Sequence, residues 1–408
     1  MARKLAYLSS EYPGISHTFI HREIGVLRER GVEVHTASIR YPAHLGVMTR
    51  AEKKEAEQTL YIKDGGVKQA LRAQWELLRT SSWAWLRLLV AGLSAGWEGT
   101  RCPMKGLYYF AEAVVLLCWM KKHGMTHVHV HFANPAATVA MIAAESGQIE
   151  YSISVHGPDI FYNIDQNLLP KKVEKARFIR SISHYCSSQL KRIVEREHWD
   201  KISIHRCGVD GYAFAPRPVP EEQPAHIVCV GRLVPAKGQH ILVDALAKLK
   251  EQNVEFRASF VGGGPDKPSL EKAVERYGLS DQVIFTGAVG QDRVRELYRS
   301  AHLFVLPSFA EGVPVVLMEA MAMEIPCVST QITGIGELIR TGTSGILVSP
   351  SDVEALAEAM LKLIQHPDRA AKMGAAGRRA VLRHYDLGKN AGALADHFEE
   401  LLGAEETR

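Results

Sequence analysis

Long apolar runs are missing from this 408-residue sequence. Its two most apolar stretches, residues 83–97 and 107–120, contain Arg87 and Glu112. Both are shorter than the roughly 20 apolar residues that a membrane-spanning helix needs. The first ten residues also lack the apolar segment of a signal peptide. We therefore expect a cytoplasmic protein, whose contact with the plasma membrane would be limited to its cytoplasmic face.

Paired cysteines and a charge surplus are missing as well. The six cysteines form no C-x-x-C motif, and none has the spacing of zinc ligands. This pattern argues against a disulfide framework and a zinc module, and favours buried thiols in a reducing compartment. The net charge of +4 is too small to indicate nucleic-acid binding. No nucleic acid is therefore predicted as a partner.

The length and the composition, with 46% hydrophobic and 23% charged residues, indicate an ordinary globular protein of two domains. The first half opens with an apolar strand at 4–9, a loop at 10–15 and a helix that ends at Gly31, with Ser16 as its N-cap. Residues 52–122 are mostly helical in pattern. Further strands are predicted at 32–39, 128–131, 151–155 and 178–182, and helices at 135–145 and 187–197.

The second half begins after a break in the pattern. Residues 208–224 contain four prolines and no clear periodicity, which is typical of a linker. Strand-like runs then alternate with helical ones, for example the helices at 239–251 and 353–365. The strands are predicted at 226–231, 256–261, 283–286, 303–306, 326–329 and 345–348. The sequence thus predicts two doubly wound, Rossmann-like α/β domains with parallel sheets.

The segment VCVGRLVPAKG, residues 228–238, combines a strand end with two cations. Arg232 and Lys237 follow the strand and precede a helix, at the edge where parallel sheets bind anions. Arginine matches phosphate oxygens with a fork of donors, and lysine adds a point charge. Taken alone, the segment favours an ordinary turn that carries surface cations.

Two further strand ends strengthen the prediction of a ligand site. Residues 261–265, VGGGP, would let the backbone at Gly263 approach a ligand closely. Residues 306–322, LPSFAEGVPVVLMEAMA, place Glu311 in a loop and Glu319 eight residues later on a helix. Because Glu319 is surrounded by apolar residues, its carboxylate requires a polar partner, which a ribose diol could provide.

These segments together resemble the retaining glycosyltransferases of family 4, which have the GT-B fold. The family is marked by a glutamate, seven residues and a second glutamate, here Glu311 and Glu319, and Gly334 with Glu337 follow. The resemblance implies two domains that face a central cleft. It places an acceptor-side domain at 1–207, a linker at 208–224 and a donor-binding domain at 225–385. The helix at about 386–408 would pack back on the first domain.

The resemblance also implies roles for residues of the second half. Arg232 and Lys237 would hold the diphosphate of a nucleotide-sugar donor, and Glu311 and Glu319 would contact the transferred sugar and the ribose. Other donor-binding positions would be Gly263, Val289, Gly312, Val313 and Pro314.

The resemblance to family 4 also extends to a histidine and two loops in the first half of the chain. Residues 154–159, SVHGPD, place His156 at a strand end, where the family has a histidine beside the transferred sugar. The loop with Gly14 would close over the phosphates. The motifs HVHFAN at 129–134 and SHTFI at 16–20 resemble a subgroup that builds bacterial exopolysaccharide, such as the colanic acid transferases. That subgroup usually has glutamate where this chain has His17.

The resemblance implies retaining transfer from a UDP- or GDP-sugar to a saccharide or polyprenyl-linked acceptor. Arg232, Lys237, His156 and Glu311 would serve catalysis, with no cofactor and no divalent metal, since no Asp-x-Asp motif is present. The alternatives are a GT-B glycoside synthase, phosphorylase or epimerase, or a non-catalytic sugar-binding protein at the membrane. The Trp-rich, basic residues 72–122 suit either a peripheral contact with the inner membrane or the packed helices of the first domain.

Overall fold

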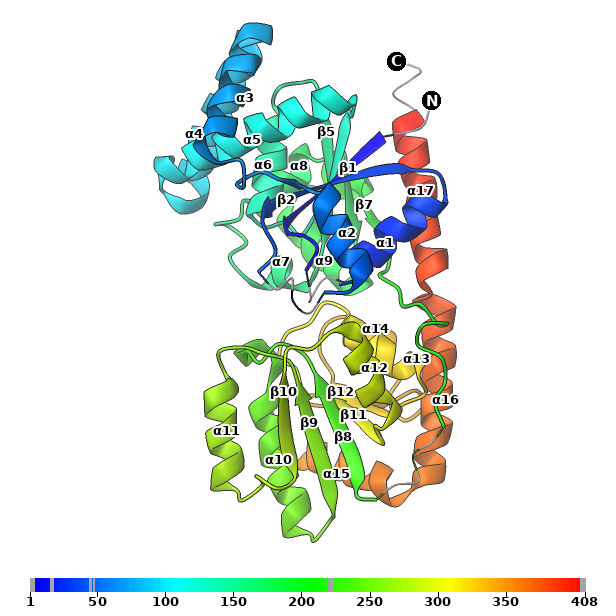
Figure 1. Ribbon diagram of the computed structural model, residues 1–408. Coiled ribbons are helices and arrows are strands. Elements are labelled where there is room, and N and C mark those ends of the chain that lie inside the picture. Colours follow the sequence, from blue (N-terminus) through cyan, green and yellow to red (C-terminus); the bar gives the residue numbers. More distant parts are fainter. Residues whose placement is uncertain are drawn as a thin grey trace. The chain divides into compact units, whose positions relative to one another are not determined.

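The computed structural model of the protein describes residues 4–14, 18–43, 46, 48–218, 220 and 223–403. The predicted N-cap Ser16 and the motif residue His17 lie outside these residues. The chain forms two compact units, one of Met1–His205 with Ala391–Arg408 and the other of Arg206–Asn390 (Figure 1). Each unit has a parallel sheet with helices. The α/β class predicted from the sequence is confirmed.

The first unit contains a seven-stranded parallel sheet in the order β3-β2-β1-β4-β5-β6-β7. The order reverses between β1 and β4, so the loops that follow these two strands diverge and leave a crevice at the carboxyl edge of the sheet. The strands are β1 (Lys4–Glu11), β2 (Glu33–Arg40), β3 (Leu60–Tyr61), β4 (His127–His131), β5 (Glu150–Val155), β6 (Phe178–Ser181) and β7 (Ile202–Ile204).

Helices cover this sheet, and several of them pack an apolar face on the strands. For example, Ile20, Ile24 and Leu27 of α1 pack with Leu5 of β1 and with Phe398 of the last helix. The helices are α1 (Thr18–Glu29), α2 (Arg50–Gln58), α3 (Gly66–Thr80), α4 (Ser82–Thr100), α5 (Pro103–His123), α6 (Pro135–Ala144), α7 (Gly157–Phe161), α8 (Leu169–Lys175), α9 (His184–Ile193) and α17 (Leu387–Gly403).

Helices α3 and α4 form an outer layer of the first unit, beyond α5 and away from the sheet (Figure 1). The two long helices α4 and α5 approach each other closely through glycines. A Cβ atom on Gly96 would lie 2.6 Å from the backbone nitrogen of Gly106, which only glycine at this position avoids. The prediction that residues 52–122 are mostly helical is confirmed.

The second unit contains a six-stranded parallel sheet in the order β10-β9-β8-β11-β12-β13. Its order reverses between β8 and β11, so a second crevice lies at the carboxyl ends of these strands. The strands are β8 (Ala225–Val230), β9 (Phe256–Val261), β10 (Val283–Gly287), β11 (Leu303–Leu306), β12 (Cys327–Thr330) and β13 (Ile346–Val348). All six predicted strands of this half are confirmed, with ends that differ by at most one residue.

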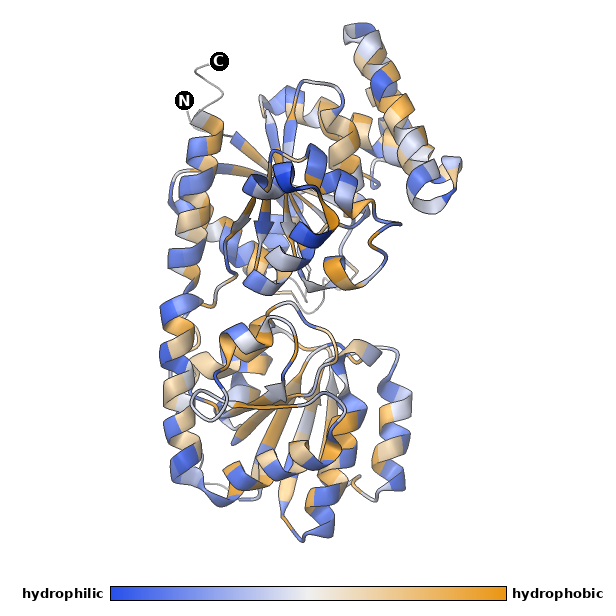
Figure 2. Ribbon diagram, turned by 180° about the vertical axis from the view of Figure 1, so that it is seen from behind, coloured by the Kyte–Doolittle hydropathy of each residue, from blue (hydrophilic) through white to orange (hydrophobic). Residues whose placement is uncertain are grey.

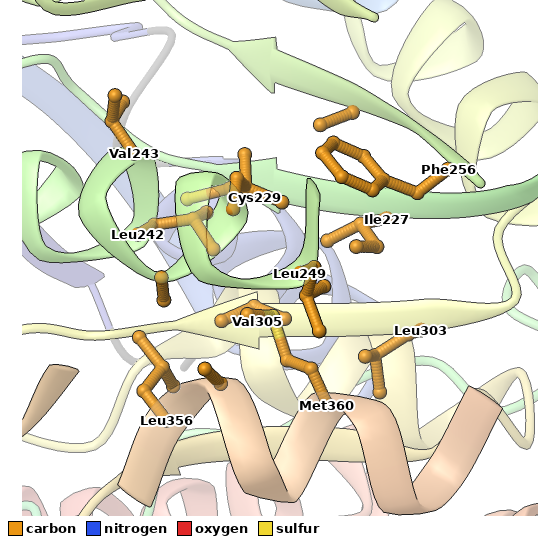
Figure 3. Close-up of a cluster of buried hydrophobic side chains, with 14 of the residues drawn as sticks. Ile227, Cys229, Leu242, Val243, Leu249, Phe256, Leu303, Val305, Leu356 and Met360 are labelled. Atoms are coloured by element: carbon orange, nitrogen blue, oxygen red, sulfur yellow. The ribbon is translucent and has the colours of Figure 1, made fainter. Parts of the chain in front are cut away.

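The core of the second unit lies between the sheet and the helices α10 and α15. Ile227, Phe256 and Val305 from three strands meet Leu249 and Met360 from these helices (Figure 3). The strands are coloured as predominantly hydrophobic in Figure 2, as expected for a sheet covered on both faces. The helices are α10 (Gln239–Glu251), α11 (Lys267–Arg276), α12 (Gln291–Arg299), α13 (Val315–Ala322), α14 (Ile335–Leu338), α15 (Val353–Gln365) and α16 (Pro367–His384).

The structure corrects two expectations. The helix predicted at 187–197 is wrong in its position: α9 is His184–Ile193, because Ser183 caps it by accepting a hydrogen bond from the backbone N–H of Cys186 at 3.0 Å. The expectation of buried thiols holds for four cysteines, but Cys102 and Cys118 are half-buried. All six thiols are free.

Candidate active site

Two predicted site residues meet at the crevice of the second unit. Lys237 follows β8, and Glu311 follows β11, the two strands between which the strand order reverses. Nζ of Lys237 lies 2.5 Å from Oε1 of Glu311. The side chains are 18% and 8% exposed, so the ion pair is largely shielded from water. The topology of the sheet thus explains why residues 74 positions apart form one charged centre.

Neighbouring side chains fix Glu311 in place. Oγ of Ser308 donates to Oε1 of Glu311 at 2.7 Å, and Oγ1 of Thr333 donates to its backbone carbonyl at 2.6 Å. Gly334 is required at this point, because a Cβ atom there would lie 2.4 Å from the carbonyl oxygen of Gly312. The loops after β11 and β12 therefore pack against each other and together hold the carboxylate of Glu311 in place.

Arg232 lies in the same loop as Lys237 but is exposed. Its side chain forms no ion pair with the residues that the structure describes, and its backbone carbonyl accepts a hydrogen bond from Nε2 of Gln239 at 2.9 Å. The guanidinium group of arginine is planar and always charged, so Arg232 can donate two parallel hydrogen bonds to an anion. Arg232 lies in the same loop as Lys237.

Two of the three glycines after β9 are required by packing, and the third is not. Gly262 and Gly264 have φ angles of +146° and +157°, and a Cβ atom on either would lie within 2.1 Å of a backbone oxygen of the Arg232 loop. Gly263, in contrast, has only atoms of Ala288 near a hypothetical Cβ, at 3.9 Å. The outer two glycines are needed for packing within the protein, while the space at Gly263 is open.

Glu319 is buried in α13, with 3% of its surface exposed. Nε2 of Gln291, the first residue of α12, donates to Oε1 of Glu319 at 3.1 Å. The partner that the apolar surroundings of Glu319 require is thus partly supplied by the protein itself. The sequence analysis did not identify Gln291, which lies two residues after the predicted donor-binding residue Val289. Its position at the start of a helix that follows a strand was the available signal.

Gly312, Val313 and Pro314 lead from the Glu311 loop into α13, whose N-cap is Pro314. The first backbone N–H groups of a helix lack carbonyl partners within it and attract anionic groups. The segment therefore places helix amides at the same edge of the sheet as Lys237 and Glu311.

In the first unit, His156 directly follows β5 and forms the N-cap of α7. Its backbone N–H donates to Oδ2 of Asp159 at 2.8 Å, and its side chain is 5% exposed. The predicted loop residue Gly14 is buried after β1. Oγ of Ser10 bonds Oδ1 of Asn134 at 2.9 Å, which joins the ends of β1 and β4. These loops lie around the point where the strand order of the first sheet reverses.

A buried lysine supports the loop after β4, which lies beside the His156 loop in the sheet order. Nζ of Lys172 donates to the carbonyls of Ala133 and Asn134 at 2.7 and 2.9 Å. Burial lowers the pKa of Lys172 to about 7, and burial raises the pKa of Asp159 to about 7. The sequence analysis missed both residues, although an aspartate three residues after a strand end is a common capping signal.

Within the described part of the chain, no group of three histidine, cysteine, aspartate or glutamate side chains is arranged to hold a metal ion. None of the helices described there is sufficiently long and hydrophobic to traverse a bilayer.

Comparison with known proteins identifies relatives of both halves. Residues 214–380 match the family model of glycosyl transferases group 1. The chain is 41% identical over 173 residues to the putative colanic acid biosynthesis glycosyltransferase WcaL of Escherichia coli (strain K12), a match that covers 41% of this chain and 43% of the relative. It thus spans less than half the length of that relative.

A second relative matches over a longer region. The GDP-mannose-dependent alpha-(1-6)-phosphatidylinositol monomannoside mannosyltransferase of Mycolicibacterium smegmatis is 28% identical over 311 residues, which are 70% of this chain and 79% of the relative. Among solved structures, Anabaena Alr3699/HepE in complex with UDP-glucose has a TM-score of 0.75 at 17% identity and covers 97% of this chain and 99% of its own. This likeness confirms the predicted GT-B fold.

Proposed function

We propose that the protein transfers a sugar from a nucleotide sugar to a saccharide acceptor in polysaccharide biosynthesis, since residues 214–380 match the family model of glycosyl transferases group 1. The observation that carries this proposal is the shielded Lys237–Glu311 pair at the reversal point of the second sheet. Such a centre offers a cation to phosphate and a carboxylate to hydroxyl groups within one loop cluster.

Each group in the cluster has a proposed role. Lys237 and Arg232 bind the diphosphate, helped by the amides at the start of α13. Glu311 accepts hydrogen bonds from hydroxyls of the transferred sugar, and Glu319, held by Gln291, accepts them from the ribose. Further donor contacts are proposed at four places. The backbone at Gly263 and the segment from Gly312 to Pro314 approach the donor, Val289 lies near its base, and Gly14 lies over its phosphates.

The proposed reaction retains the anomeric configuration and needs no divalent metal. The bond between the anomeric carbon and the diphosphate oxygen breaks, and its electron pair stays on that oxygen. The acceptor hydroxyl then bonds the anomeric carbon from the same face, while its proton passes to the leaving diphosphate. Arg232 and Lys237 stabilise the charge that develops, and preorganised groups of this kind contribute ~10²–10³ each in rate. His156 lies beside the sugar in this scheme.

The donor is a UDP- or GDP-sugar in this proposal. One relative is named as GDP-mannose-dependent, and one structural neighbour contains UDP-glucose. A thermal-shift screen of the full chain against UDP- and GDP-sugars tests the donor site, with Glu319→Gln as the matched variant. We expect stabilisation by one nucleotide class, weakened in the variant. Equal behaviour with every nucleotide sugar and with buffer alone would reject the donor site.

The acceptor is proposed to be a saccharide carried on a lipid at the cytoplasmic face of the membrane. The support is the outer apolar face of α3 and α4, where Trp75, Trp83 and Trp97 are 60–69% exposed. Apolar residues recur on it every three or four positions, so each helix presents one stripe. The face consists of Val67, Leu71, Trp75, Leu78, Trp83, Leu86, Val90, Leu93 and Trp97.

Charge and shape support the same contact. Residues 66–105 contain six basic residues and two acidic ones, which favours an anionic lipid surface. Beside this face, a groove of about 430 Å³ lies between α4, α6 and α8. Its lining includes Trp83, Val90 and Ile142, so it offers an apolar surface to a lipid chain.

A further inference from the structure

The side chain of His156 is held by other aromatic rings inside the first unit. It stacks on His131, the last residue of β4, with ring centroids 5.5 Å apart and an interplanar angle of 24°. The ring centroids of Phe19 and Phe132 lie 5.2 and 4.5 Å from that of His156. Nδ1 of His131 is 3.3 Å from Nε2 of His156. The imidazole of His156 therefore has one orientation and shares a proton with His131.

Behind His131 lies a buried carboxylate. Nε2 of His131 is 3.3 Å from Oε1 of Glu23, on α1, a close contact that lacks the geometry of a hydrogen bond. Glu23 accepts hydrogen bonds from the hydroxyl of Tyr7 at 3.0 Å and from NH1 of Arg180 at 2.5 Å. Burial alone would raise the pKa of Glu23, but Arg180 and His131 outweigh burial and hold this pKa well below its usual range. Glu23 is thus an ionised acceptor at neutral pH.

The neighbours of His131 keep it uncharged. Glu23 faces it from α1, Tyr7 from β1, His129 from β4 and Arg180 from β6. Burial lowers the pKa of His131, even though the carboxylate of Glu23 acts in the opposite direction. A neutral imidazole has one donor nitrogen and one acceptor nitrogen.

The donor nitrogen of His131 follows from its two neighbours. An ionised carboxylate can only accept, so the proton of His131 belongs on Nε2, toward Glu23. Nδ1 of His131 must then accept, and the proton between the two rings belongs to Nε2 of His156. The loop after β5 holds the ring beside His131, because the backbone N–H of Asp159 donates to the backbone carbonyl of His156 at 3.2 Å and the backbone N–H of His156 donates to Oδ2 of Asp159 at 2.8 Å.

We propose that Glu23 and His131 are positioning residues that hold His156 as a neutral imidazole protonated on Nε2. The consequence for catalysis rests on the proposed function. A fixed, uncharged ring is compatible with the positive charge that develops on the sugar, whereas an imidazolium would oppose it. The tautomer itself does not depend on any donor or acceptor.

Nitrogen-15 NMR of the full chain with labelled histidines tests the tautomer directly. The signals of His131 and His156 are assigned by their loss in His131→Phe and His156→Phe. At pH 7 and without donor, we expect pyrrole-like Nε2 and pyridine-like Nδ1 signals for both residues. A proton on Nδ1 of His156, or on both of its nitrogens, would overturn the proposal even if the protein transfers sugar.

Removal of the carboxylate tests the positioning role. Glu23→Gln alone leaves the guanidinium of Arg180 buried without its counter-charge and is expected to unfold the unit. The double variant Glu23→Gln/Arg180→Met removes both charges. We expect the His156 signals to report exchange between tautomers, and kcat to fall about 10- to 100-fold while KM for the donor changes less, because orientation is lost.

His127→Phe is the matched control. His127 is buried in the same strand, and its Nε2 bonds Ser152 at 2.7 Å. This variant is expected to keep the His156 tautomer and kcat. An unchanged tautomer with unchanged kcat in the double variant would overturn the proposal. If no nucleotide sugar is turned over by the parent, the proposed function fails, while the NMR result still decides the tautomer.

Discussion

Lys237 has the most direct proposed role among single residues, because its ammonium group already lies against Glu311 and retains donors for a phosphate. Lys237→Ala is expected to lower kcat with a nucleotide sugar by ~10²–10³ while the fold persists. Lys248→Ala is the control, since Lys248 lies on the exposed side of α10 and pairs with Glu354. Steady-state kinetics with circular dichroism measures both. Near-normal turnover of Lys237→Ala would remove it from the phosphate site.

The glycines after β9 allow packing and ligand contact to be separated. Gly264→Ala is expected to destabilise the protein by more than about 1 kcal/mol, because its φ is +157° and Leu233 O would lie 2.1 Å from the new methyl group. Gly263→Ala is expected to change stability by less than about 0.5 kcal/mol but to weaken nucleotide binding. Calorimetric titration and thermal unfolding distinguish the two. Unaltered binding by Gly263→Ala would place the ligand elsewhere.

Lys172 and Asp159 make the stability of the protein depend on pH, and the sign of this dependence follows from their pKa values. The pKa of Asp159 is raised to about 7 by burial, so its contribution to stability is lost as the pH rises through 7. The pKa of Lys172 is lowered to about 7 by burial, so its contribution is lost as the pH falls through 7. The two buried groups together therefore lower the free energy of unfolding most near pH 7.

The variant Asp159→Asn/Lys172→Met removes this dependence. We expect the gain in free energy of unfolding, relative to the parent, to be largest near pH 7 and smaller at pH 5 and pH 9. Urea unfolding at the three pH values measures it. A difference that is constant with pH, or smallest near pH 7, would show that the two groups do not titrate as their burial implies.

Among the elements, the strands of the second unit could be predicted because they are short apolar runs, most of which end at or just before glycine, proline or serine. The edge strands β3 and β7 could not, since they have only two and three residues and, unlike β13, are not followed by a turn-forming residue. The Glu311 and Glu319 motif identified two acids of the site. Gln291 and Ser308 could not be assigned as their partners, because the contacts depend on which strands are neighbours in the sheet.

The outer apolar face of α3 and α4 is a property of whole elements rather than of one side chain. The triple variant Trp75→Gln/Trp83→Gln/Trp97→Gln is expected to reduce flotation with anionic vesicles about tenfold or more, because interfacial tryptophans and apolar area drive such binding. Tyr212→Gln, which alters a 96% exposed aromatic residue of the second unit, is the control. Equal flotation of triple variant and control, or no flotation of the parent, would contradict membrane docking by this face.

At the scale of the whole molecule, two units with the same reversal of strand order each bring loops together at a carboxyl edge. The doubly wound pattern was evident from the alternation of strands and helices in the sequence. The networks behind the loops were not, because the partnership of Glu23 with Arg180 joins residues 157 positions apart through the sheet. Sequence patterns thus located the proposed donor residues, and the structure added the groups that hold them.

We propose that Lys237 and Glu311 form a centre that binds a nucleotide-sugar donor without a divalent metal. Release of nucleoside diphosphate from a panel of UDP- and GDP-sugars, measured in the presence of EDTA, tests it most directly. We predict release from one nucleotide class by the parent, undiminished by EDTA, and a loss of about 10²-fold or more in Lys237→Ala. No release from any donor, or release that disappears with EDTA and returns with Mg²⁺, would contradict the account.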